Sequence, residues 1–465
     1  MNDRTSRRRF VKQTGAMLIA GAIGSRAYGK TRVLELVPRH EPPGPRSPND
    51  NIRIATLGLG LMGKGDTETA LKVPGVELVA VADVYDGRLA RAKELWGDKI
   101  FTTRDYREIL ARKDVDAVII ATPDHWHAQM AIDAMAAGKD VYLEKPMVHE
   151  LAEGQRIIET QLRTKRILQV GSQRVSSIIY AKARELLKAG AIGELNLVEA
   201  AWERNSPLGA WQYSIPPDAS PATIDWDRFL GRAPRRPFEP IRLFRWRNYR
   251  DYGTGVPGDL FVHLFSGIHY VLDSLGPTQI MAQGGLRFWE DGRDVPDVVV
   301  GLYDYPEARA HPAFNIVLRV NFAAAGGSEE AFRFVGPEGI LTVSQSGVTR
   351  TRVPKRMEPG YTIDTFPKAV QEQFLKQYRE KYPERAPEMA AHEDERYVPP
   401  RGYDDRLDHF KNFFAAVRSR QPVVEDAAFG MRAAGPALVT NLSYTDERAY
   451  AWDPVAMKVV QPAAS

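Results

Sequence analysis

The segment Gly58–Gly63, which reads GLGLMG, decides the fold of the first half of this 465-residue chain. It follows a short run rich in β-branched residues and precedes a stretch of helical character, so we place it in a strand-to-helix turn. In such a turn the first glycine allows a tight bend, the second lets a pyrophosphate approach the backbone, and the third allows close packing of helix on strand. Amide groups at the helix start can then bind phosphate. The residues expected to bind a dinucleotide here are Gly58, Gly60, Leu61, Met62 and Gly63.

Outward from this turn, short apolar strands alternate with helices up to about residue 146. This alternation is typical of a parallel, doubly wound sheet, so we assign residues 51–172 to a Rossmann domain that binds NAD or NADP. Asp83 ends the second strand, twenty residues after Gly63. A carboxylate there can bind both ribose hydroxyls, which favours NAD. Arg88 and Arg91 follow closely and are placed to meet a 2′-phosphate instead, so NADP stays an alternative.

After about residue 170 the pattern changes to strands with period-2 alternation and few helices between them. The predicted strands are 193–204, 279–288, 297–305, 313–323, 330–339 and 340–345. They indicate an open, mostly antiparallel sheet in a second α/β domain, residues 173–465. The fold class is therefore α/β, with an N-terminal Rossmann domain and a C-terminal domain built on a large sheet. A charged, proline-punctuated surface insertion near 355–400 carries a predicted helix at 368–382, and two more helices follow at 406–420 and 427–444.

The N-terminal 29 residues have the features of an export signal. Ser6-Arg7-Arg8-Arg9-Phe10-Val11-Lys12 precedes a mildly apolar run at 16–23, and the order of charged, apolar and small residues resembles a twin-arginine (Tat) signal. The run is too short to span a bilayer. We therefore expect a signal peptide at 1–29 that engages the Tat export machinery, a bacterial periplasmic or otherwise exported protein, and no stable membrane anchor. Residues 30–50 are rich in proline and predict an arm or linker.

Charge and composition exclude several classes of function. Residues 1–29 contain six basic residues and one acidic residue, while the whole chain has a net charge of +4, so the remainder is close to neutral. Residues 30–465 therefore lack the strong positive charge that is typical of nucleic-acid-binding proteins. The chain has no cysteine, which excludes thiol catalysis, cysteine-ligated zinc and disulfides. No dense ligand cluster appears either, so we expect no metal.

Two segments at strand ends are candidates for the reaction site. Thr122-Pro123 ends the third predicted strand, and Glu144-Lys145-Pro146 ends the fourth. In open parallel sheets ligands bind beyond the carboxyl ends of the strands, so both segments are expected to face a bound nicotinamide. Lys145 can hold and polarise a substrate hydroxyl. A proline after it commonly marks a cis or tightly constrained turn.

These motifs together resemble the Gfo/Idh/MocA family. The resemblance rests on GLGLMG, on ATPDHWHAQMAIDAMAAGKDVYLEKPM at 121–147, on YGTGVPGDLFVHLFSGIHYVLD at 252–273, and on NLSYTDERAYAWDP at 441–454. It implies a Rossmann domain, a larger α/β domain whose open sheet serves substrate binding and oligomer contacts, and NAD(P)-dependent oxidation of a sugar or cyclitol hydroxyl. A homo-oligomer, dimer or tetramer, is implied as well.

The resemblance also implies catalytic residues. The family pattern is a lysine in E-K-P and an Asp-x-x-x-His preceded by glycines, which here are Lys145, Asp259 and His263. On a helix Asp259 and His263 share a face. His263 can then take the hydroxyl proton while Asp259 binds substrate or orients the imidazole. His269 is the alternative base, but the residue four before it is Phe265, so we favour His263.

Other candidates are weaker because each also fits ordinary core or surface placement. His127 matches the family position that lines the nicotinamide pocket, and Gln173 follows the next strand, where relatives place residues near the cofactor. Aromatic rings stack on sugars, and Arg or Asn side chains bind hydroxyls. The candidate sugar-binding residues are Arg174, Trp202, Arg204, Asn205, Trp246–Arg250 and His269.

Export constrains the chemistry that we expect. Little free NAD(H) exists outside the cytoplasm, so the cofactor should be tightly bound and regenerated in place by passing the hydride to a second sugar. The alternative is an NAD-dependent glycosidase, a branch implied by the family resemblance, which oxidises a ring hydroxyl, eliminates the aglycone, adds water and returns the hydride. Such an enzyme needs no paired carboxylates. A third reading is a non-catalytic sugar-binding protein, against which the intact catalytic residues argue.

Overall fold

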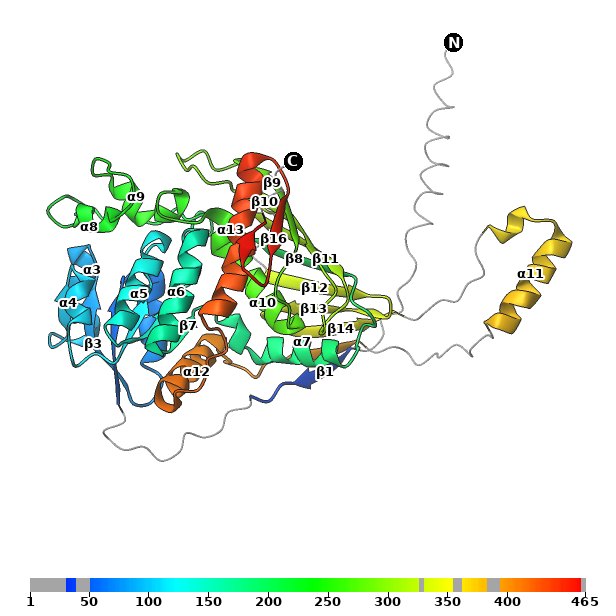
Figure 1. Cartoon of the computed structure of the whole chain (residues 1–465), viewed down its shortest axis with the longest axis horizontal. Helices are drawn as coiled ribbons and strands as arrows, with labels where there is room; N and C mark the ends of the chain where they lie inside the picture. Colours follow the sequence, from blue (N-terminus) through cyan, green and yellow to red (C-terminus); the bar gives the residue numbers. More distant parts are fainter. Residues whose placement is uncertain (1–30, 39–50, 326–329, 354–361, 383–393, 461–465) are drawn as a thin grey trace, which may run out of the picture.

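The computed structural model describes residues 31–38, 51–325, 330–353, 362–382 and 394–460. The predicted signal peptide lies outside the described residues, as do parts of the arm and of the insertion. Figure 1 shows two α/β regions side by side, with α13 (Ala427–Asp446) between them. Among the described residues, no helix is long and apolar enough to cross a bilayer.

The first region contains the predicted Rossmann sheet. Six strands pair in parallel in the order β4-β3-β2-β5-β6-β7. Every residue of β5 and β6 is buried because helices cover both faces of the sheet. The strands are β2 (Ile52–Leu57), β3 (Val76–Ala82), β4 (Phe101–Thr103), β5 (Ala117–Ile120), β6 (Asp140–Leu143) and β7 (Leu168–Val170). The helices are α2 (Leu61–Ala70), α3 (Asp86–Trp96), α4 (Tyr106–Leu110), α5 (His127–Ala136) and α6 (Leu151–Thr164).

A helix from the C-terminal half completes the Rossmann core. α12 (Asp405–Ser419) buries Phe410, Phe413 and Phe414 against the apolar side chains of β2 and β5. The ring of Phe410 stacks on that of Tyr142 in β6, with centroids 4.3 Å apart. The Rossmann region is therefore not built from residues 51–172 alone. One face of its sheet is covered by α12, which comes near the C-terminal end of the chain.

The second region contains the predicted large sheet. It has 11 strands in the order β1-β15-β14-β13-β12-β8-β11-β10-β9-β16-β17. The β1–β15 and β8–β11 pairs are parallel and the others antiparallel, which confirms a mostly antiparallel sheet. The strands are β1 (Arg32–Glu35), β8 (Leu197–Glu203), β9 (Gln279–Gly285), β10 (Val298–Tyr305), β11 (Phe314–Asn321), β12 (Glu330–Gly336), β13 (Gly339–Ser344), β14 (Gly347–Arg352), β15 (Glu395–Val398), β16 (Tyr450–Asp453) and β17 (Lys458–Val459).

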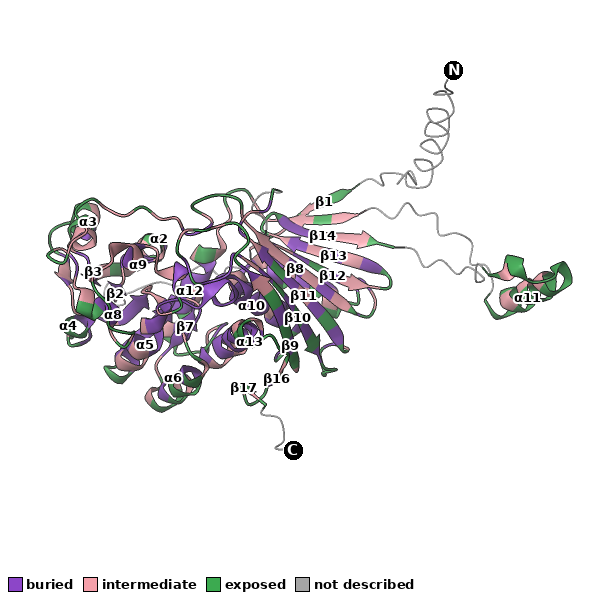
Figure 2. Ribbon diagram, turned by 90° about the horizontal axis from the view of Figure 1, so that it is seen from above, coloured by how far each residue is buried: buried purple, intermediate pink, exposed green. Residues whose placement is uncertain are grey.

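In the described part of the chain, helices cover one face of this sheet and leave the other bare. α7 (Ile178–Lys188), α10 (Val262–Leu272) and α13 pack on the inner face, where Figure 2 shows the buried residues concentrated. On β10, residues alternate strictly between buried and exposed, so Val300 and Leu302 point away from the helices. A short π-helical turn, η5 (Pro257–Phe261), leads into α10 without a break.

Two elements differ from expectation or extend it. Residues 32–35 of the predicted arm form β1, which is the edge strand of the large sheet and pairs with β15. The free edge of β15 offers backbone groups with which an extended segment can pair. The predicted helix of the insertion is confirmed as α11 (Lys368–Lys381), preceded by η6 (Ile363–Thr365), and none of its residues is buried. Figure 1 draws it away from both sheets.

Residues 215–250, here called the cover segment, belong to the predicted second domain but lie over the Rossmann region. They contain α8 (Trp226–Leu230), α9 (Pro240–Phe244) and η4 (Trp246–Asn248), and Figure 1 shows α8 and α9 above the Rossmann helices. Their apolar side chains form a separate core with Tyr85 from the loop after β3. The cover segment therefore buries a surface just beyond the carboxyl end of β3.

Candidate active site

The glycine turn has the geometry that its sequence predicts. Gly58 has a φ of 86°, and a Cβ there would lie 2.8 Å from the Ala121 carbonyl oxygen. A Cβ on Gly63 would lie 1.9 Å from the Gly58 oxygen. Both positions therefore require glycine. At Gly60 the nearest atom to a Cβ is the Arg88 guanidinium nitrogen at 3.7 Å, so no backbone blocks this side of the turn.

The start of α2 is open for a ligand. Gly60 is its N-cap and supplies no side-chain cap, and Leu61 at the first helical position is exposed while Met62 is half-buried. The amide groups of the first turn are thus left for an anion. The turn, the free helix start and the position at the end of β2 fit the pyrophosphate of a dinucleotide.

A cavity opens beside this turn. Its walls include Gly58, Gly60, Asp83, Thr122 and Pro123. Thr122 Oγ1 is buried there without a hydrogen-bond partner among the described residues. The cavity is therefore lined by the residues of the glycine turn, of the second strand end and of the third strand end that the sequence predicted to bind the cofactor.

Asp83 is fixed in the cavity wall by three donors. Its Oδ2 accepts the Leu59 amide at 2.7 Å, its Oδ1 accepts the Tyr85 amide at 3.0 Å, and Arg88 Nη1 pairs with Oδ2 at 3.3 Å. The Leu59 contact ties the second strand end to the glycine turn. A carboxylate held in this position suits ribose hydroxyls and disfavours a 2′-phosphate at the same place.

The cover segment supplies the opposite wall of the cavity. Its contributing residues are Arg228, Phe229, Leu243 and Trp246. Tyr85 Oη donates to Asp218 Oδ1 at 2.6 Å, and Trp126 Nε1 donates to the Phe229 oxygen at 2.9 Å. Backbone bonds join Asp225 N to Val84 O and Asp86 N to Thr223 O, at 2.9 and 3.0 Å. The cavity is thus enclosed between two segments that are far apart in sequence.

The predicted catalytic residues meet just after β6, whose neighbour β5 ends at the cavity residues Thr122 and Pro123. Among the described residues, the lining of the cavity itself includes none of the three. Lys145 Nζ donates to the Asp259 carbonyl oxygen at 2.8 Å and to Asp259 Oδ1 at 2.9 Å. Asp259 lies in η5 and His263 in the first turn of α10, so one helical run presents both. Arg247 Nε donates to the same Oδ1 at 3.1 Å. The peptide bond between Lys145 and Pro146 is cis.

The electrostatics of the group follow from burial and from these charges. Burial alone would raise the pKa of Asp259, but Lys145, Arg247 and Arg204 together hold it well below its ordinary value. Burial, followed by the charges of Lys145 and Arg174, holds the pKa of His263 well below its ordinary value. His263 Nδ1 is buried without a hydrogen-bond partner among the described residues. The lowered pKa favours the neutral form of the imidazole, which is the form that a general base needs.

Glu144 and Gln173 form a buried pair behind Lys145. Gln173 Nε2 donates to Glu144 Oε1 at 2.9 Å, and Gln173 has a positive φ of 29°. Burial raises the pKa of Glu144 to about 7, although Lys145 and Arg247 oppose the shift. Asp66 of α2, which sequence analysis missed, has a pKa raised well above its ordinary value by burial and by Glu144. Neither Asp66 oxygen has a hydrogen-bond partner among the described residues.

His127 joins two turns of the predicted site. Its Nδ1 lies 2.7 Å from the Pro146 oxygen and its Nε2 lies 3.0 Å from the Thr122 oxygen. The ring thus spans the two turns that end β5 and β6 and holds them together. Its expected contact with the cofactor stays a prediction.

Three of the weaker substrate candidates also have other partners. His269 is buried under the large sheet, with Nε2 2.8 Å from Tyr305 Oη, so its expected role in substrate binding is wrong. Arg174 Nε and Nη1 pair with Glu330 and Asp405, at 3.1 and 2.9 Å. Trp246 lines the dinucleotide cavity. The sequence shows that these residues have an aromatic ring or a guanidinium group, but it does not show which residues they contact.

Asn205 and Arg204 follow β8 but differ in environment. Asn205 is exposed and, among the described residues, makes no hydrogen bond to the Lys145 group. Arg204 instead stacks on the Trp202 ring, 5.3 Å from its centroid, and the Trp202 and His263 ring centroids are 5.2 Å apart. The sequence named Arg204 and Arg247 only within loose sets of sugar-binding candidates. Their link to Asp259 depends on contacts between residues distant in the chain.

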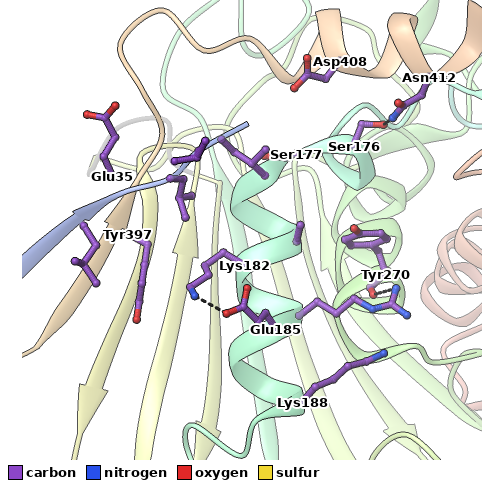
Figure 3. A pocket seen from close by; sticks show the side chains of 16 residues that line it. Glu35, Ser176, Ser177, Lys182, Glu185, Lys188, Tyr270, Tyr397, Asp408 and Asn412 are labelled. Atoms are coloured by element: carbon purple, nitrogen blue, oxygen red, sulfur yellow. Dashed lines mark hydrogen bonds and ion pairs between the residues drawn. The ribbon is translucent and has the colours of Figure 1, made fainter. Parts of the chain in front are cut away.

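A second hollow lies elsewhere, between β1, β15 and α7 (Figure 3), with a volume of about 910 Å³. In it Lys182 pairs with Glu185, and Tyr397 lies beneath the Lys182 ammonium group at 4.5 Å. It contains none of the predicted catalytic or cofactor residues, so we do not treat it as the active site. Within the described ranges, no group of three or more His, Asp or Glu residues is arranged to hold a metal ion.

Comparison with known families agrees with this geometry. Residues 52–172 match the model of the oxidoreductase family with an NAD-binding Rossmann fold, and residues 208–284 match the model of that family's C-terminal alpha/beta domain. The chain belongs to the Gfo/Idh/MocA oxidoreductase family, which confirms the resemblance drawn from its motifs.

Individual relatives are similar over part of the chain. A glycosyl hydrolase family 109 protein of Shewanella sp. strain W3-18-1 is 30% identical over 213 residues, covering 42% of this chain and 45% of its own length. An inositol 2-dehydrogenase of Salmonella paratyphi B is 32% identical over 145 residues, covering 31% and 43%. The chain thus spans less than half the length of these curated relatives. A levoglucosan dehydrogenase crystallised with NADH and levoglucosan shares the fold, with a TM-score of 0.60, 19% identity and coverage of 86% and 98%.

Proposed function

We propose that the protein is an NAD(P)-dependent oxidoreductase that oxidises a hydroxyl of a sugar, glycoside or cyclitol. The observation that carries this proposal is the meeting of Lys145, Asp259 and His263 after β6, next to the strand end that forms part of the cavity at the glycine turn. Relatives named inositol 2-dehydrogenase and levoglucosan dehydrogenase support the substrate class.

Each of the three residues has one role in the proposed reaction. A nicotinamide nucleotide, when bound, supplies the hydride acceptor. Lys145 donates a hydrogen bond to the substrate hydroxyl and polarises it. The carboxylate and the backbone carbonyl of Asp259 hold the ammonium group of Lys145 in place. His263 takes the hydroxyl proton, because its lowered pKa favours the neutral imidazole.

The choice of nucleotide rests on Asp83. Its carboxylate lies in the cavity wall where ribose hydroxyls are bound in Rossmann folds, and a 2′-phosphate there would meet a buried negative charge. Arg88 is already paired with Asp83, which leaves it less free to bind a phosphate. We propose NAD as the preferred cofactor, with NADP as the alternative.

Export through the Tat pathway and a retained cofactor complete the proposal. The motif at Ser6–Lys12 supports export to the periplasm. The cover segment supports retention, since a dinucleotide in the cavity would lie between it and the Rossmann sheet. Release would then require the two to separate.

Mass spectrometry of denatured protein tests retention directly. Mature protein, purified without added nucleotide, is expected to release about one nicotinamide nucleotide per chain. A Tyr85→Phe variant removes the bond to Asp218 and should lose nucleotide faster on dialysis, whereas Tyr382→Phe on the exposed end of the insertion should not. Protein that releases no nucleotide and binds none when NAD or NADP is added contradicts the oxidoreductase.

A glycosidase working by transient oxidation is the second candidate. The partial similarity to glycosyl hydrolase family 109 proteins favours it, and it would use the same lysine and histidine. Product analysis separates the two. A keto-sugar with reduced nucleotide indicates a dehydrogenase, whereas a hydrolysed glycoside with no net change of the nucleotide indicates a glycosidase.

We also propose that the protein is a homo-oligomer assembled through the outer face of the large sheet. Met281, Leu302 and Val317 are cross-strand neighbours on this face, and the first two are about half exposed. Exposed apolar rows of this kind mark interfaces. Light scattering should give a mass of two or four chains, and Leu302→Glu should give a monomer.

A further inference from the structure

Three cations lie around His263, and two of them share a carboxylate. Lys145, Arg204 and Arg247 are the cations, and Asp259 pairs with Lys145 and Arg247. Asp124 is the next carboxylate, near enough to influence Arg247. Among the described residues, neither carboxylate forms an ion pair with Arg204.

The other carboxylates nearby have partners of their own. Asp124 Oδ2 already accepts the amide and the hydroxyl of Thr254, at 3.0 and 2.7 Å. Glu144 accepts a hydrogen bond from Gln173 at 2.9 Å, and burial raises its pKa to about 7. Glu330 and Asp405 both pair with Arg174, and Glu330 acts on Arg204 from beyond ion-pair distance.

Arg204 is the cation that lacks a counter-ion. Its Nη1 donates to the Gly209 oxygen at 2.9 Å, and among the described residues no carboxylate oxygen lies within 4.0 Å of the guanidinium. Its charge nevertheless contributes to the lowered pKa of His263 and of Asp259. A half-buried guanidinium with open donors beside a catalytic base is costly unless something pairs with it.

Its surroundings make Arg204 suitable for a ligand. Trp202 supports one face of the guanidinium at 5.3 Å, and Phe322 lies 5.6 Å away, so the aromatic rings restrict its motion and leave its edge for hydrogen bonding. A planar guanidinium edge matches the two oxygens of a carboxylate or of a sulfate ester. The same Trp202 contacts His263, which places such an anion on the molecule being oxidised.

We propose that the substrate is a sugar bearing one singly charged anionic group, a carboxylate or a sulfate ester, and that Arg204 binds this group and sets the preference for it. The proposal rests on the proposed function in one respect: it takes the Lys145–Asp259–His263 group as the place where the sugar binds. It adds the chemical class of the substrate and the residue that selects it.

Calorimetry on the nucleotide-loaded wild-type protein is the first test. The probes are matched sets that differ only in charge: glucose with glucuronate and glucose 6-sulfate, and galactose with galacturonate and galactose 6-sulfate. A charged hydrogen bond predicts that an anionic member binds at least roughly 10-fold more tightly than its neutral partner in one or both sets. A preference for the uronate or for the sulfate identifies which anion is recognised. The proposal is overturned if every anionic sugar binds as weakly as its neutral partner or more weakly. It is also overturned if none of the probes binds.

Variants then assign the preference to Arg204. Arg204→Gln should lose most of the roughly 10-fold preference, measured as the ratio of anionic to neutral affinity within one variant. Arg204→Lys should retain part of this ratio, since the charge remains but the planar guanidinium is lost. Arg319→Gln is the matched control, because Arg319 lies on the neighbouring strand with its side chain exposed and paired with Glu203. An unchanged preference in folded Arg204→Gln overturns the assignment.

The outcomes also separate this inference from the proposed function. Selective binding of anionic sugars without any reduction of the bound nucleotide would support the anion site and count against the oxidoreductase. Oxidation of neutral sugars in preference to anionic ones would support the oxidoreductase and overturn the anion site.

Discussion

Lys145 and Asp259 are joined twice, since the ammonium group bonds both the carbonyl oxygen and the carboxylate of the same residue. The two residues are 114 positions apart, so this contact also joins the two regions of the chain at the reaction site. Arg247 shares the carboxylate. One side chain of η5 therefore fixes the lysine of the Rossmann half and the arginine of the cover segment.

Lys145→Met should abolish hydride transfer and leave nucleotide binding almost intact. The ammonium group is needed to polarise the hydroxyl, a contribution of about 10²–10⁴ in rate, whereas the glycine turn and Asp83 lie elsewhere, in the cavity wall. Turnover and released nucleotide are measured on the same preparation. Lys188→Met, at a largely exposed lysine of α7, serves as the control and should behave as wild type. Normal turnover in Lys145→Met would reject the assignment.

Asp259→Asn should destabilise the fold as well as reduce turnover. It leaves the charges of Lys145 and Arg247 buried without their shared counter-ion, and breaking a buried pair of this kind costs about 3–5 kcal/mol. Urea unfolding near pH 7 measures the loss. Asp446→Asn removes an exposed carboxylate at the end of α13 and should change the unfolding free energy little. Equal stability of Asp259→Asn and wild type would contradict the electrostatic description of the site.

Gly63→Ala and Gly65→Ala form a matched pair within α2. A Cβ on Gly63 would lie 1.9 Å from the Gly58 oxygen, so we expect the turn to shift, nucleotide to be lost and stability to fall by about 1–3 kcal/mol. A Cβ on Gly65 meets no atom within 4 Å, so this variant should gain about 0.5–1 kcal/mol. Unfolding curves and nucleotide content together check both expectations. Two variants of equal stability would show that the glycine turn is looser than described.

Glu425→Gln should flatten the dependence of stability on pH. Glu425 is buried in the core behind the site, where Ser172 Oγ donates to Oε1 at 2.9 Å, and burial raises its pKa to about 8. Between its unfolded pKa, about 4.3, and this value, the folded protein holds a proton that the unfolded chain has released. Stability from this group is therefore fully present below that range and is lost as pH rises through it.

The loss in the wild type approaches about 1.4 kcal/mol for each pH unit. Urea unfolding at several pH values across this range should give a steeper decline for wild type than for Glu425→Gln. Glu290→Gln, at an exposed position, controls for the change of charge. Parallel curves for wild type and Glu425→Gln would mean that Glu425 is ionised in the folded protein.

Local chemistry explains which parts of the site could be predicted. Gly58 and Gly63 are read directly from the sequence because backbone geometry at a tight turn excludes a side chain. Lys145 is predictable because it follows a strand end, and strand ends meet at one edge of a parallel sheet. Asp259 and His263 follow from the family resemblance of their motif, and helical spacing adds that they share a face, although the turn that holds Asp259 is π-helical.

The remaining features depend on contacts that no local pattern encodes. The Tyr85–Asp218 bond spans 133 positions, and the packing of α12 on the Rossmann sheet spans more. His127 and His269 show the same limit, because a histidine serves equally well as a donor to buried carbonyls or hydroxyls and as a ligand contact. Its neighbours in space decide between these roles.

The most direct test of the central claim is whether the bound nucleotide is reduced when a sugar is added. Nucleotide-loaded protein is mixed with neutral and anionic sugars, and the absorbance of reduced nicotinamide is followed in a single turnover. The account predicts reduction by at least one sugar in wild type and none in Lys145→Met, with the same nucleotide content in both. Equal reduction in wild type and Lys145→Met would contradict this claim. So would a nucleotide-loaded wild-type protein that oxidises no sugar or glycoside, even transiently.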